Sequence, residues 1–527
     1  MRLALAQLNT VVGDLDGNRE RILAALADAR EQGADVLVTP ELAVTAYPPE
    51  DLLLRPAFVE AAMESTRLIA AACTGIVALV GTPWSFDGAL ANACAVCADG
   101  EITAIYRKRL LPNYGVFDEE RYFEPGGEAL VLPLAGLRAG LTVCEDVWQP
   151  GPAAELAAAG AELLVNLSAS PFHVGKAEER ETMLAGRARD NGLPLVFCNA
   201  VGGQDELLFD GHSAVLDATG AVLARAPGFE EHLLVVDLDD PAAATTVPFA
   251  PPLEQMWSAL TLALRDYAGK NGFGDAVLGI SGGIDSALVA ALAADALGPE
   301  RVHCVSMPSR FSSEGTRTDA RRAAESIGCA FREIAIEPVV AAFDEVLPGL
   351  AGLAAENLQA RIRGMILMSL SNAEGWLVLA TGNKSELSVG YSTLYGDLAG
   401  GFAPIKDVYK TDVFRLARLL NDRAGRELIP VSIIERPPSA ELRADQRDED
   451  SLPPYDLLDA VLEGYVEHDR SRENLIEDGF DPAVVERALS LVDRAEYKRR
   501  QAPPGVKLRP KAFGRDRRTP ITNRWRG

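Results

Sequence analysis

A six-residue segment in the second half of the chain has the residue types of a phosphate-binding loop: Ser281-Gly282-Gly283-Ile284-Asp285-Ser286. It follows an apolar stretch and precedes an amphipathic helical pattern that runs to residue 298. Two glycines let the backbone approach an anion closely, and N–H groups at a helix start can bind phosphate. Asp285 would repel phosphate unless a divalent cation lies between them, so the segment implies Mg²⁺. A plain strand-to-helix turn is the alternative, but this pattern is much rarer, and it is not a Walker A loop.

A second candidate is Cys144, which ends the apolar stretch 137–143. Two acidic residues, Glu145 and Asp146, follow it directly, and negative neighbours make a thiolate harder to form. A nucleophile and a small buried core residue are both compatible with this position.

The composition limits the class of protein. The chain has 527 residues, of which 48% are hydrophobic and 24% charged, and this predicts two or three globular domains. No apolar run is long enough to span a bilayer, and the first residues lack a signal-peptide pattern, so no membrane attachment is expected. The net charge of −25 disfavours a nucleic-acid partner. Seven irregularly spaced cysteines indicate free thiols in a reducing cytoplasm.

Strand and helix patterns alternate along the whole chain, which predicts an α/β class. In the first half, strand patterns lie at 3–9, 34–41, 75–83, 161–170 and 193–200. The alternation stops in an Ala-, Thr- and Pro-rich stretch at 235–252. Later strands are separated by long helices, which predicts a doubly wound parallel sheet with strands at 275–281, 301–308, 330–336 and 375–383. The predicted organisation is a domain at 1–245, a linker at 246–256 and a domain at 257–527.

Other cysteines and a histidine are assigned to the core. Cys94 and Cys97 are spaced like one of the two ligand pairs of a zinc site, but the sequence has no second Cys or His pair at ligand spacing. The alternation of residue types around them is typical of a strand. Cys198, His303 and Cys304 lie in apolar strand patterns. The last thirty residues are strongly basic, and composition alone favours a solvated arm over a contact with a phosphate-bearing ligand.

The segment 281–286 resembles the pyrophosphate-binding loop of ATP pyrophosphatases. The stretches 356–372, 379–397 and 404–420 resemble NAD⁺ synthetases in order and spacing. This resemblance implies that ATP is cleaved between its α and β phosphates, and that the adenylated substrate is attacked by a nitrogen nucleophile. It implies ATP contacts from Ile280, Ser281, Gly282, Gly283, Ile284, Asp285, Ser286, Thr381 and Lys410.

The same resemblance implies a dinucleotide site and a metal site. The deamido-NAD⁺ contacts would come from Asn357, Arg361, Glu386 and Lys511, and the Mg²⁺ contacts from Asp285 and Glu386. Lys511 lies in 509–518, which resembles the basic closing segment of the family, so part of the basic tail is expected to contact substrate. Leu394 stands where ammonia-only synthetases tend to carry a lysine, and no role is assigned to it.

ATP-driven amide formation needs ammonia, which is scarce and mostly protonated at neutral pH, so a glutaminase in the first half would complete the reaction. A glutaminase with an N-terminal nucleophile needs a cysteine at its start, but the chain begins Met1-Arg2. A Cys-His-Glu site needs a partner histidine, and no histidine of the first half has a telling context: His173, His212 and His232. The first half instead resembles the nitrilase family of carbon–nitrogen hydrolases at 38–52, 106–126 and 141–148.

The nitrilase resemblance implies a Glu-Lys-Cys site, with Glu41 as general base, Lys108 at the oxyanion and Cys144 as nucleophile. A carboxylate can take the thiol proton, and an ammonium can face the charge that develops on the tetrahedral intermediate. Glu41 or Lys108 alone would be assigned to structure or solvent, but the ordered triple with its flanks favours catalysis. Contacts to L-glutamine are implied for Tyr114, Ser170 and Lys176.

Together the halves resemble glutamine-dependent NAD⁺ synthetases, which implies a nitrilase-like αββα sandwich followed by a Rossmann-like, doubly wound domain. The implied reaction converts deamido-NAD⁺, ATP, glutamine and water into NAD⁺, AMP, pyrophosphate and glutamate. A protected ammonia path and a homo-oligomer built on a synthetase-domain dimer are also expected. Two alternatives stay open: a related ligase acting on another carboxylate or carbonyl, and a non-catalytic nitrilase-like module fused to an ammonia-using synthetase.

Overall fold

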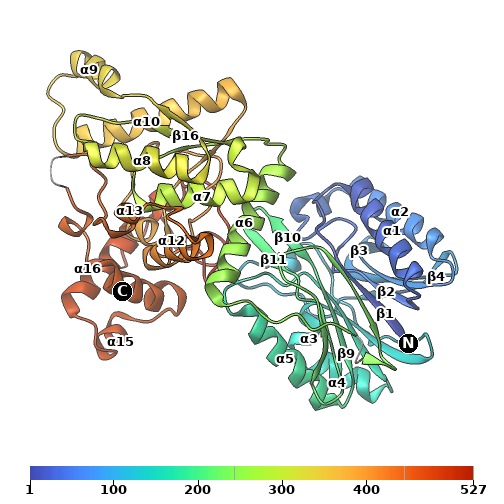
Figure 1. The fold of residues 1–527 in the computed structure, drawn as a ribbon. Helices are drawn as coiled ribbons and strands as arrows, with labels where there is room; N and C mark the ends of the chain where they lie inside the picture. Colours follow the sequence, from blue (N-terminus) through green and yellow to red (C-terminus); the bar gives the residue numbers. More distant parts are fainter. Residues whose placement is uncertain (242–243, 444–445, 526–527) are drawn as a thin grey trace. The chain divides into compact units, whose positions relative to one another are not determined.

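The computed structural model describes residues 1–241, 244–443 and 446–525 (Figure 1). The chain divides into two compact units, Met1–Pro251 and Pro252–Gly527. The first helix of the second unit, α6 (Pro252–Lys270), begins at this division. The predicted domain limits at 245 and 257 stay predictions. Within the described ranges, no helix has both the length and the apolar character needed to cross a membrane.

The first unit contains two six-stranded sheets and a two-stranded ribbon of β10 (Val201–Gln204) and β11 (Leu207–Asp210). In the order β14-β1-β2-β3-β4-β5, the first sheet contains β14 (His232–Asp237), β1 (Arg2–Gln7), β2 (Val36–Val38), β3 (Val77–Phe86), β4 (Ala89–Ala98) and β5 (Glu101–Arg107). In the order β13-β12-β9-β8-β7-β6, the second contains β13 (Val222–Arg225), β12 (Ala214–Leu216), β9 (Leu195–Asn199), β8 (Leu163–Ser168), β7 (Leu137–Val143) and β6 (Val131–Leu134).

Alternation of side chains along the strands produces four layers in this unit. On β1, Leu3 and Leu5 enter the core between the sheets, where Val143 of β7 also lies. Ala4 and Ala6 point the other way, into the core beneath α1 (Leu15–Glu31) and α2 (Pro56–Ala72). The outer face of the second sheet packs against α3 (Glu145–Trp148), α4 (Pro150–Ala158) and α5 (Lys176–Asn191) (Figure 1). The predicted αββα sandwich is confirmed.

The second unit is built on a four-stranded parallel sheet of order β17-β16-β15-β18, with β15 (Ala276–Gly279), β16 (Val302–Ser306), β17 (Ala330–Glu333) and β18 (Leu377–Leu379). The chain proceeds from β15 through β16 to β17 and then returns to the other side of β15 as β18. The connections contain α7 (Ile284–Leu297), α8 (Glu314–Ile327), α9 (Glu337–Val346) and α10 (Leu353–Glu374). Doubly wound sheets bind ligands beyond the carboxyl ends of the strands where the strand order reverses, and residues 281–286 leave β15 at this point.

The remaining helices of this unit are α11 (Lys384–Val389), α12 (Lys410–Ala424), α13 (Val431–Glu435), α14 (Tyr455–Leu462), α15 (Arg472–Glu477), α16 (Pro482–Arg494) and α17 (Glu496–Arg499). Part of the basic tail docks against this helical region rather than forming a solvated arm. Val506 and Leu508 are buried, and the Asp407 carboxylate accepts the N–H groups of Leu508 and Arg509 at 2.8 Å each. Apolar and basic residues alternate at 506–509, so the side chains of Val506 and Leu508 can be buried on one side of the segment. The overall composition of the tail does not reveal this pattern.

Lys384 joins the tail to α11 and is expected to stabilise the second unit. Its fully buried ammonium pairs with Asp407 at 2.8 Å and Glu467 at 2.9 Å, and donates to the Lys511 carbonyl at 2.9 Å. Lys384→Met leaves two buried carboxylates without their cation, so the free energy of unfolding is expected to fall by about 3–5 kcal/mol in denaturant titrations. Arg415→Ala removes an exposed guanidinium from Asp412, which keeps its pairing with Arg509, so this substitution is expected to change the free energy of unfolding by less than about 1 kcal/mol. An unchanged unfolding midpoint for Lys384→Met would contradict this role.

The cysteines assigned to the core lie there. Cys94 and Cys97 are both on β4, but their side chains enter different cores on opposite faces of the sheet, so they do not converge on one site. Cys198 on β9 and Cys304 on β16 are buried. His303 is half-buried and stacks on Trp376, with ring centroids 3.7 Å apart.

Candidate active sites

The three residues predicted to be catalytic in the first unit each follow a strand. Glu41 lies shortly after β2, Lys108 directly after β5, and Cys144 directly after β7. All three are buried, with 2%, 0% and 3% of their surfaces exposed. The two sheets therefore bring together residues that lie up to 103 positions apart in the sequence, as the positions 41 and 144 show.

Lys108 connects two carboxylates. Its Nζ lies 2.7 Å from Oε1 of Glu41 and 2.8 Å from Oε1 of Glu119. Glu41 also accepts a hydrogen bond from Asn92 Nδ2 at 2.7 Å and another from the Ala169 N–H at 3.1 Å. This network holds the Glu41 carboxylate and the Lys108 ammonium in fixed orientations.

Cys144 has an unusual backbone conformation, with φ of 44° and ψ of −101°, at the turn from β7 into α3. Non-glycine residues in such regions are strained, and they cluster at functional sites. Burial and the Glu41 carboxylate raise the pKa of the Cys144 thiol well above its ordinary value, although the Lys108 ammonium acts in the opposite direction. The thiol is therefore protonated at neutral pH, and a nucleophilic role requires a base beside it.

Glu119, on a short 3₁₀ helix (Glu119–Arg121), was missed by the sequence analysis. Burial raises the pKa of its carboxyl to about 7, against the opposing effect of Lys108, and Tyr47 donates to it at 2.9 Å. Its Oε2 atom is buried without a hydrogen-bond partner among the described residues. No local sequence signal distinguishes Glu119 from its neighbour Glu120, because its environment comes from distant residues.

The raised pKa of Glu119 leads to a prediction of how glutamine use depends on pH. Below about pH 7 the Glu119 carboxyl gains a proton, which weakens its pairing with Lys108. The pair of carboxylates Glu41 and Glu119 then already holds one proton and is less able to accept another from the Cys144 thiol. The kcat/KM for glutamine is therefore expected to rise with pH through an apparent pKa of about 7. Glu119→Gln is expected to remove this limb as well as lower the rate. An unchanged acidic limb in Glu119→Gln, measured by glutamate release, would contradict the assignment.

The predicted glutamine-binding residues lie around Cys144. The half-exposed Tyr114 donates to Glu145 Oε2 at 2.9 Å. Lys176, at the start of α5, lies with its Nζ 4.0 Å from the ring centroid of Trp148, and burial lowers the pKa of its ammonium. Ser170 is buried after β8, and its N–H donates to Asn199 Oδ1 at 2.9 Å. A negative charge at Cys144 would raise the pKa of both Tyr114 and Lys176, which is consistent with both side chains lying near the sulfur.

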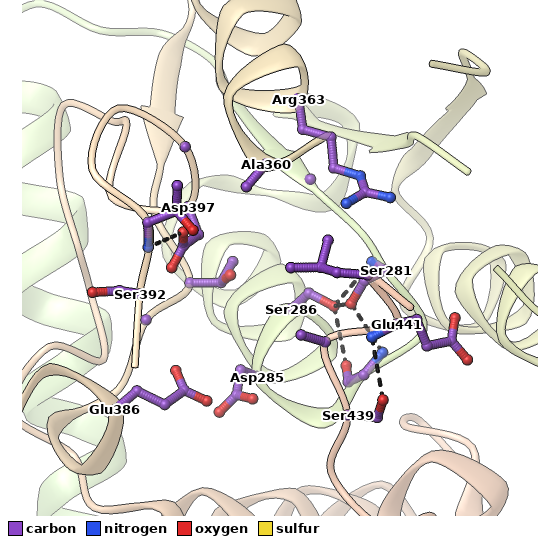
Figure 2. A pocket seen from close by; sticks show the side chains of 18 of the residues that line it. Ser281, Asp285, Ser286, Ala360, Arg363, Glu386, Ser392, Asp397, Ser439 and Glu441 are labelled. Atoms are coloured by element: carbon purple, nitrogen blue, oxygen red, sulfur yellow. Dashed lines mark hydrogen bonds between the residues drawn. The ribbon is translucent and has the colours of Figure 1, made fainter. Parts of the chain in front are cut away.

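In the second unit, a cavity of about 540 Å³ lies beside the predicted phosphate loop and is lined by all seven residues from Ile280 to Ser286 (Figure 2). Gly282 has a φ of 83°, and a Cβ atom there would lie 2.2 Å from the Thr316 carbonyl oxygen, so this position requires glycine. Gly283 caps α7 with an extended backbone, and Ser281 Oγ accepts the Gly283 N–H at 3.1 Å. The start of this 14-residue helix faces the cavity, as expected for an anion site.

Asp285, Glu386 and Lys410 meet at this cavity. Lys410 Nζ pairs with Asp285 Oδ2 and lies 3.1 Å from Glu386 Oε1, while Asn383 Nδ2 donates to Asp285 Oδ1 at 2.9 Å. Burial raises the pKa of Glu386 to about 8, against the opposing charge of Lys410. Burial disfavours the charged form of Lys410, but the two carboxylates hold its pKa above the ordinary value. Figure 2 shows the Asp285 and Glu386 carboxylates facing each other.

These residues fit a Mg²⁺ ion that arrives with phosphate. Within residues 1–241, 244–443 and 446–525, no three His, Cys, Asp or Glu side chains are grouped to hold a metal ion. Mg²⁺ is commonly bound by one or two carboxylates together with substrate phosphates, so Asp285 and Glu386 supply a suitable oxygen set without a preformed cage.

Thr381, Asn357 and Arg361 also line the cavity, whereas Lys511 does not. Asn357 Oδ1 accepts from Thr393 at 2.8 Å, and Arg361 Nε donates to the Leu394 carbonyl at 3.2 Å. The Lys511 ammonium pairs with Asp469. The sequence analysis missed further lining residues: Arg363, Asp397, Arg436, Ser439, Glu441 and Asp448.

Asp397 and Asp448 are the missed acids with the most perturbed surroundings. Burial raises the pKa of Asp397 to about 6, and its Oδ1 accepts the Thr393 N–H at 2.6 Å. Burial also raises the pKa of Asp448, whose Oδ2 accepts from Tyr455 at 2.9 Å. Asp397 is the last residue of the stretch 379–397, which was expected to lie near the site, but nothing in the sequence indicated that its side chain is buried.

Two family models match the chain: carbon-nitrogen hydrolase over residues 2–246 and NAD synthase over residues 256–502. Two glutamine-dependent NAD(+) synthetases, from Xanthomonas campestris pv. campestris and Thermotoga maritima, are 47% and 46% identical to it. Both comparisons span 100% of this chain, with 98% and 99% of the relatives. A solved structure of glutamine-dependent NAD⁺ synthetase from Acinetobacter baumannii in complex with adenosine diphosphate is 41% identical. It aligns with a TM-score of 0.80 over 99% of this chain and 98% of that one. The two sites, the two matched domains and these full-length relatives lead to one conclusion: the chain belongs to the family of glutamine-dependent NAD(+) synthetases.

Proposed function

We propose that the chain converts deamido-NAD⁺, ATP, L-glutamine and water into NAD⁺, AMP, pyrophosphate and glutamate. One observation carries this proposal: the same chain contains two sites that match the two halves of the reaction. The first is the buried cluster of Glu41, Lys108 and Cys144, and the second is the loop 281–286 with Glu386 and Lys410. As a member of this family, the chain is a ligase that uses ATP as a co-substrate. This replaces the alternative of a related ligase acting on another carboxylate.

In the first unit, Cys144 acts as the nucleophile. Its Sγ attacks the side-chain amide carbon of glutamine as Glu41 takes the thiol proton, and Lys108 faces the oxygen that gains negative charge. The carbon–nitrogen bond then breaks, and the leaving ammonia takes the proton from Glu41. Water attacks the resulting γ-glutamyl thioester, and its proton passes through Glu41 to the sulfur as glutamate leaves. Tyr114, Ser170 and Lys176 bind the polar ends of glutamine.

In the second unit, the N–H groups at 281–286 and the Lys410 ammonium bind the ATP phosphates, and Thr381 contacts the nucleotide. The deamido-NAD⁺ carboxylate attacks the α-phosphorus and pyrophosphate leaves; ammonia then attacks the adenylated carbonyl carbon and AMP leaves. Asp285 and Glu386 would hold Mg²⁺, which offsets phosphate charge when bound. Asn357 and Arg361 bind deamido-NAD⁺, and Lys511, which pairs with Asp469 outside the cavity, would leave that pair to reach the dinucleotide.

The proposal includes an assembly and a location. Ammonia passes between the two sites along a protected path, because free ammonia is mostly protonated at neutral pH. The chain forms a homo-oligomer through its synthetase unit, and the exposed apolar residues of α10 support this: Leu353 (70% exposed), Met365 (51%) and Met368 (38%). The reaction takes place in the cytoplasm, where the seven free cysteines stay reduced.

The test supplies glutamine labelled with ¹⁵N in its amide, together with deamido-NAD⁺, ATP, Mg²⁺ and an excess of unlabelled ammonium. The expected product is NAD⁺ whose carboxamide carries ¹⁵N in excess of the free ammonium pool. Unlabelled NAD⁺ would refute the protected transfer, and the absence of NAD⁺ with either nitrogen source would refute the synthetase assignment.

A further inference from the structure

Asp146, two residues after Cys144, is completely buried, and its carboxylate accepts hydrogen bonds from four groups, none of which is the Cys144 thiol. Its Oδ1 accepts the N–H groups of Arg109 at 3.1 Å and Leu110 at 2.9 Å. Its Oδ2 accepts the Val143 N–H at 3.0 Å and the Tyr106 hydroxyl at 2.8 Å. Both oxygens are therefore occupied by donors.

The four donors lie on both sides of the catalytic cluster. Tyr106, Arg109 and Leu110 flank Lys108 on the segment that leaves β5, whereas Val143 immediately precedes Cys144 on β7. One carboxylate thus joins the backbone that carries the ammonium to the backbone that carries the nucleophile.

We propose that Asp146 is a positioning residue for glutamine hydrolysis, which fixes Lys108 relative to the strained turn at Cys144. This inference rests on the proposed role of Cys144 as the nucleophile. Hydrogen bonds from main-chain N–H groups to a carboxylate are among the stronger ones in proteins, so the connection is stiff. An acid at position 146 is needed for this geometry, because two oxygens must accept from donors on opposite sides.

The neighbouring Glu145 makes different contacts. Its carboxylate accepts from the side chains of Tyr114 at 2.9 Å and Gln149 at 3.3 Å, on the side of the predicted glutamine contacts. The two acids after the nucleophile therefore have different surroundings: Glu145 is linked to the substrate region, and Asp146 to the backbone of the catalytic residues.

The substitution that tests the proposal is Asp146→Asn. An amide of the same size has one acceptor oxygen, and its NH₂ group faces either the Arg109 and Leu110 N–H groups or the Val143 N–H. The displacement of Lys108 from Cys144 is expected to lower kcat for glutamine hydrolysis by about 10- to 100-fold. The KM for glutamine and the ammonium-driven formation of NAD⁺ are expected to stay near the parent values, because substrate contacts and the second unit are unchanged. Asp28→Asn, at an exposed position of α1 in the same unit, is the matched control.

The measured quantities are kcat and KM for glutamate release and the rate of thioester formation in a single turnover. Thioester formation at the parent rate in folded Asp146→Asn, or an effect confined to KM, would overturn the proposal. If Asp146→Asn does not fold, Tyr106→Phe tests the role instead, because it removes one of the four donors to Asp146. Slower thioester formation in Tyr106→Phe would support the positioning role, and an unchanged rate would reject it. Glutamine hydrolysis that persists in Cys144→Ala would instead refute the assignment of Cys144 as the nucleophile. This result distinguishes a failure of the proposed function from a failure of the positioning role of Asp146.

Discussion

Cys144→Ala is expected to abolish glutamine-dependent NAD⁺ formation while leaving the ammonium-dependent reaction near the parent rate. The substitution removes the sulfur that would form the thioester, and Cys144 belongs to the first unit, whereas the proposed ATP site is built from residues of the second unit. Removal of a catalytic nucleophile lowers rates by about 10⁴-fold or more. NAD⁺ formation is measured with deamido-NAD⁺, ATP and Mg²⁺, supplying either glutamine or ammonium.

The matched control is Cys198→Ala, which removes another buried thiol of the same unit from β9. Its thiol donates to the carbonyl groups of Ala6 and Val38 and belongs to neither predicted site, so both reactions are expected to persist. If Cys144→Ala still consumed glutamine, the first unit would not be the predicted nitrilase-like glutaminase. The alternative of a non-catalytic first unit predicts that the parent itself uses only ammonium.

Asp285→Asn is expected to remove NAD⁺ formation from both nitrogen sources. Asp285 pairs with Lys410 and accepts from Asn383, and an amide of the same size cannot supply the negative charge that Lys410 and Mg²⁺ would face. Loss of one preorganised electrostatic contact lowers kcat by about 10²–10³-fold. The rates with glutamine and with ammonium are measured side by side, and a parallel fall is expected.

Asp422→Asn, at an exposed position of α12, is the control for a lost carboxylate in the same unit. A normal ammonium-driven rate in Asp285→Asn would place phosphate binding elsewhere. The two substitutions are expected to differ in selectivity, which assigns each site to its own chemistry: Cys144→Ala affects only the reaction with glutamine, and Asp285→Asn affects the reactions with glutamine and with ammonium.

The sequence predicted those features that depend on neighbouring residues. Apolar stretches located β15, β16 and β18, because each of these strands buries its side chains within a few positions, and the stretch 330–336 located β17 although most of its side chains are exposed. The loop at 281–286 could be identified because its glycines are required locally: Gly282 has a positive φ and no space for a Cβ. Cys144 could likewise be placed at a strand end, since the apolar stretch before it stops there.

The surroundings of the acids could not be predicted in this way. Glu119 and Glu120 are indistinguishable as neighbours in the sequence, yet only Glu119 meets Lys108. Glu145 and Asp146 looked like two unfavourable charges beside a thiol, but one binds Tyr114 and the other binds main-chain N–H groups. The resemblance to known families suggested which residues matter, but it did not indicate what each of them contacts.

The chain's own sequence predicted the α/β class, the two-part organisation, the glycine-containing loop at 281–286 and the strand-end position of Cys144, because periodicity and turn chemistry act over a few residues; the nucleophile role of Cys144 came from the family resemblance. The tertiary structure alone decided that the basic tail docks through Asp407 and Lys384, that Lys108 lies between Glu41 and Glu119, and that Lys511 lies outside the cavity. The physical reason is that a charge acquires its partners, its burial and its pKa from segments far away in the chain. Such contacts form only when the strands and helices that carry them have packed together.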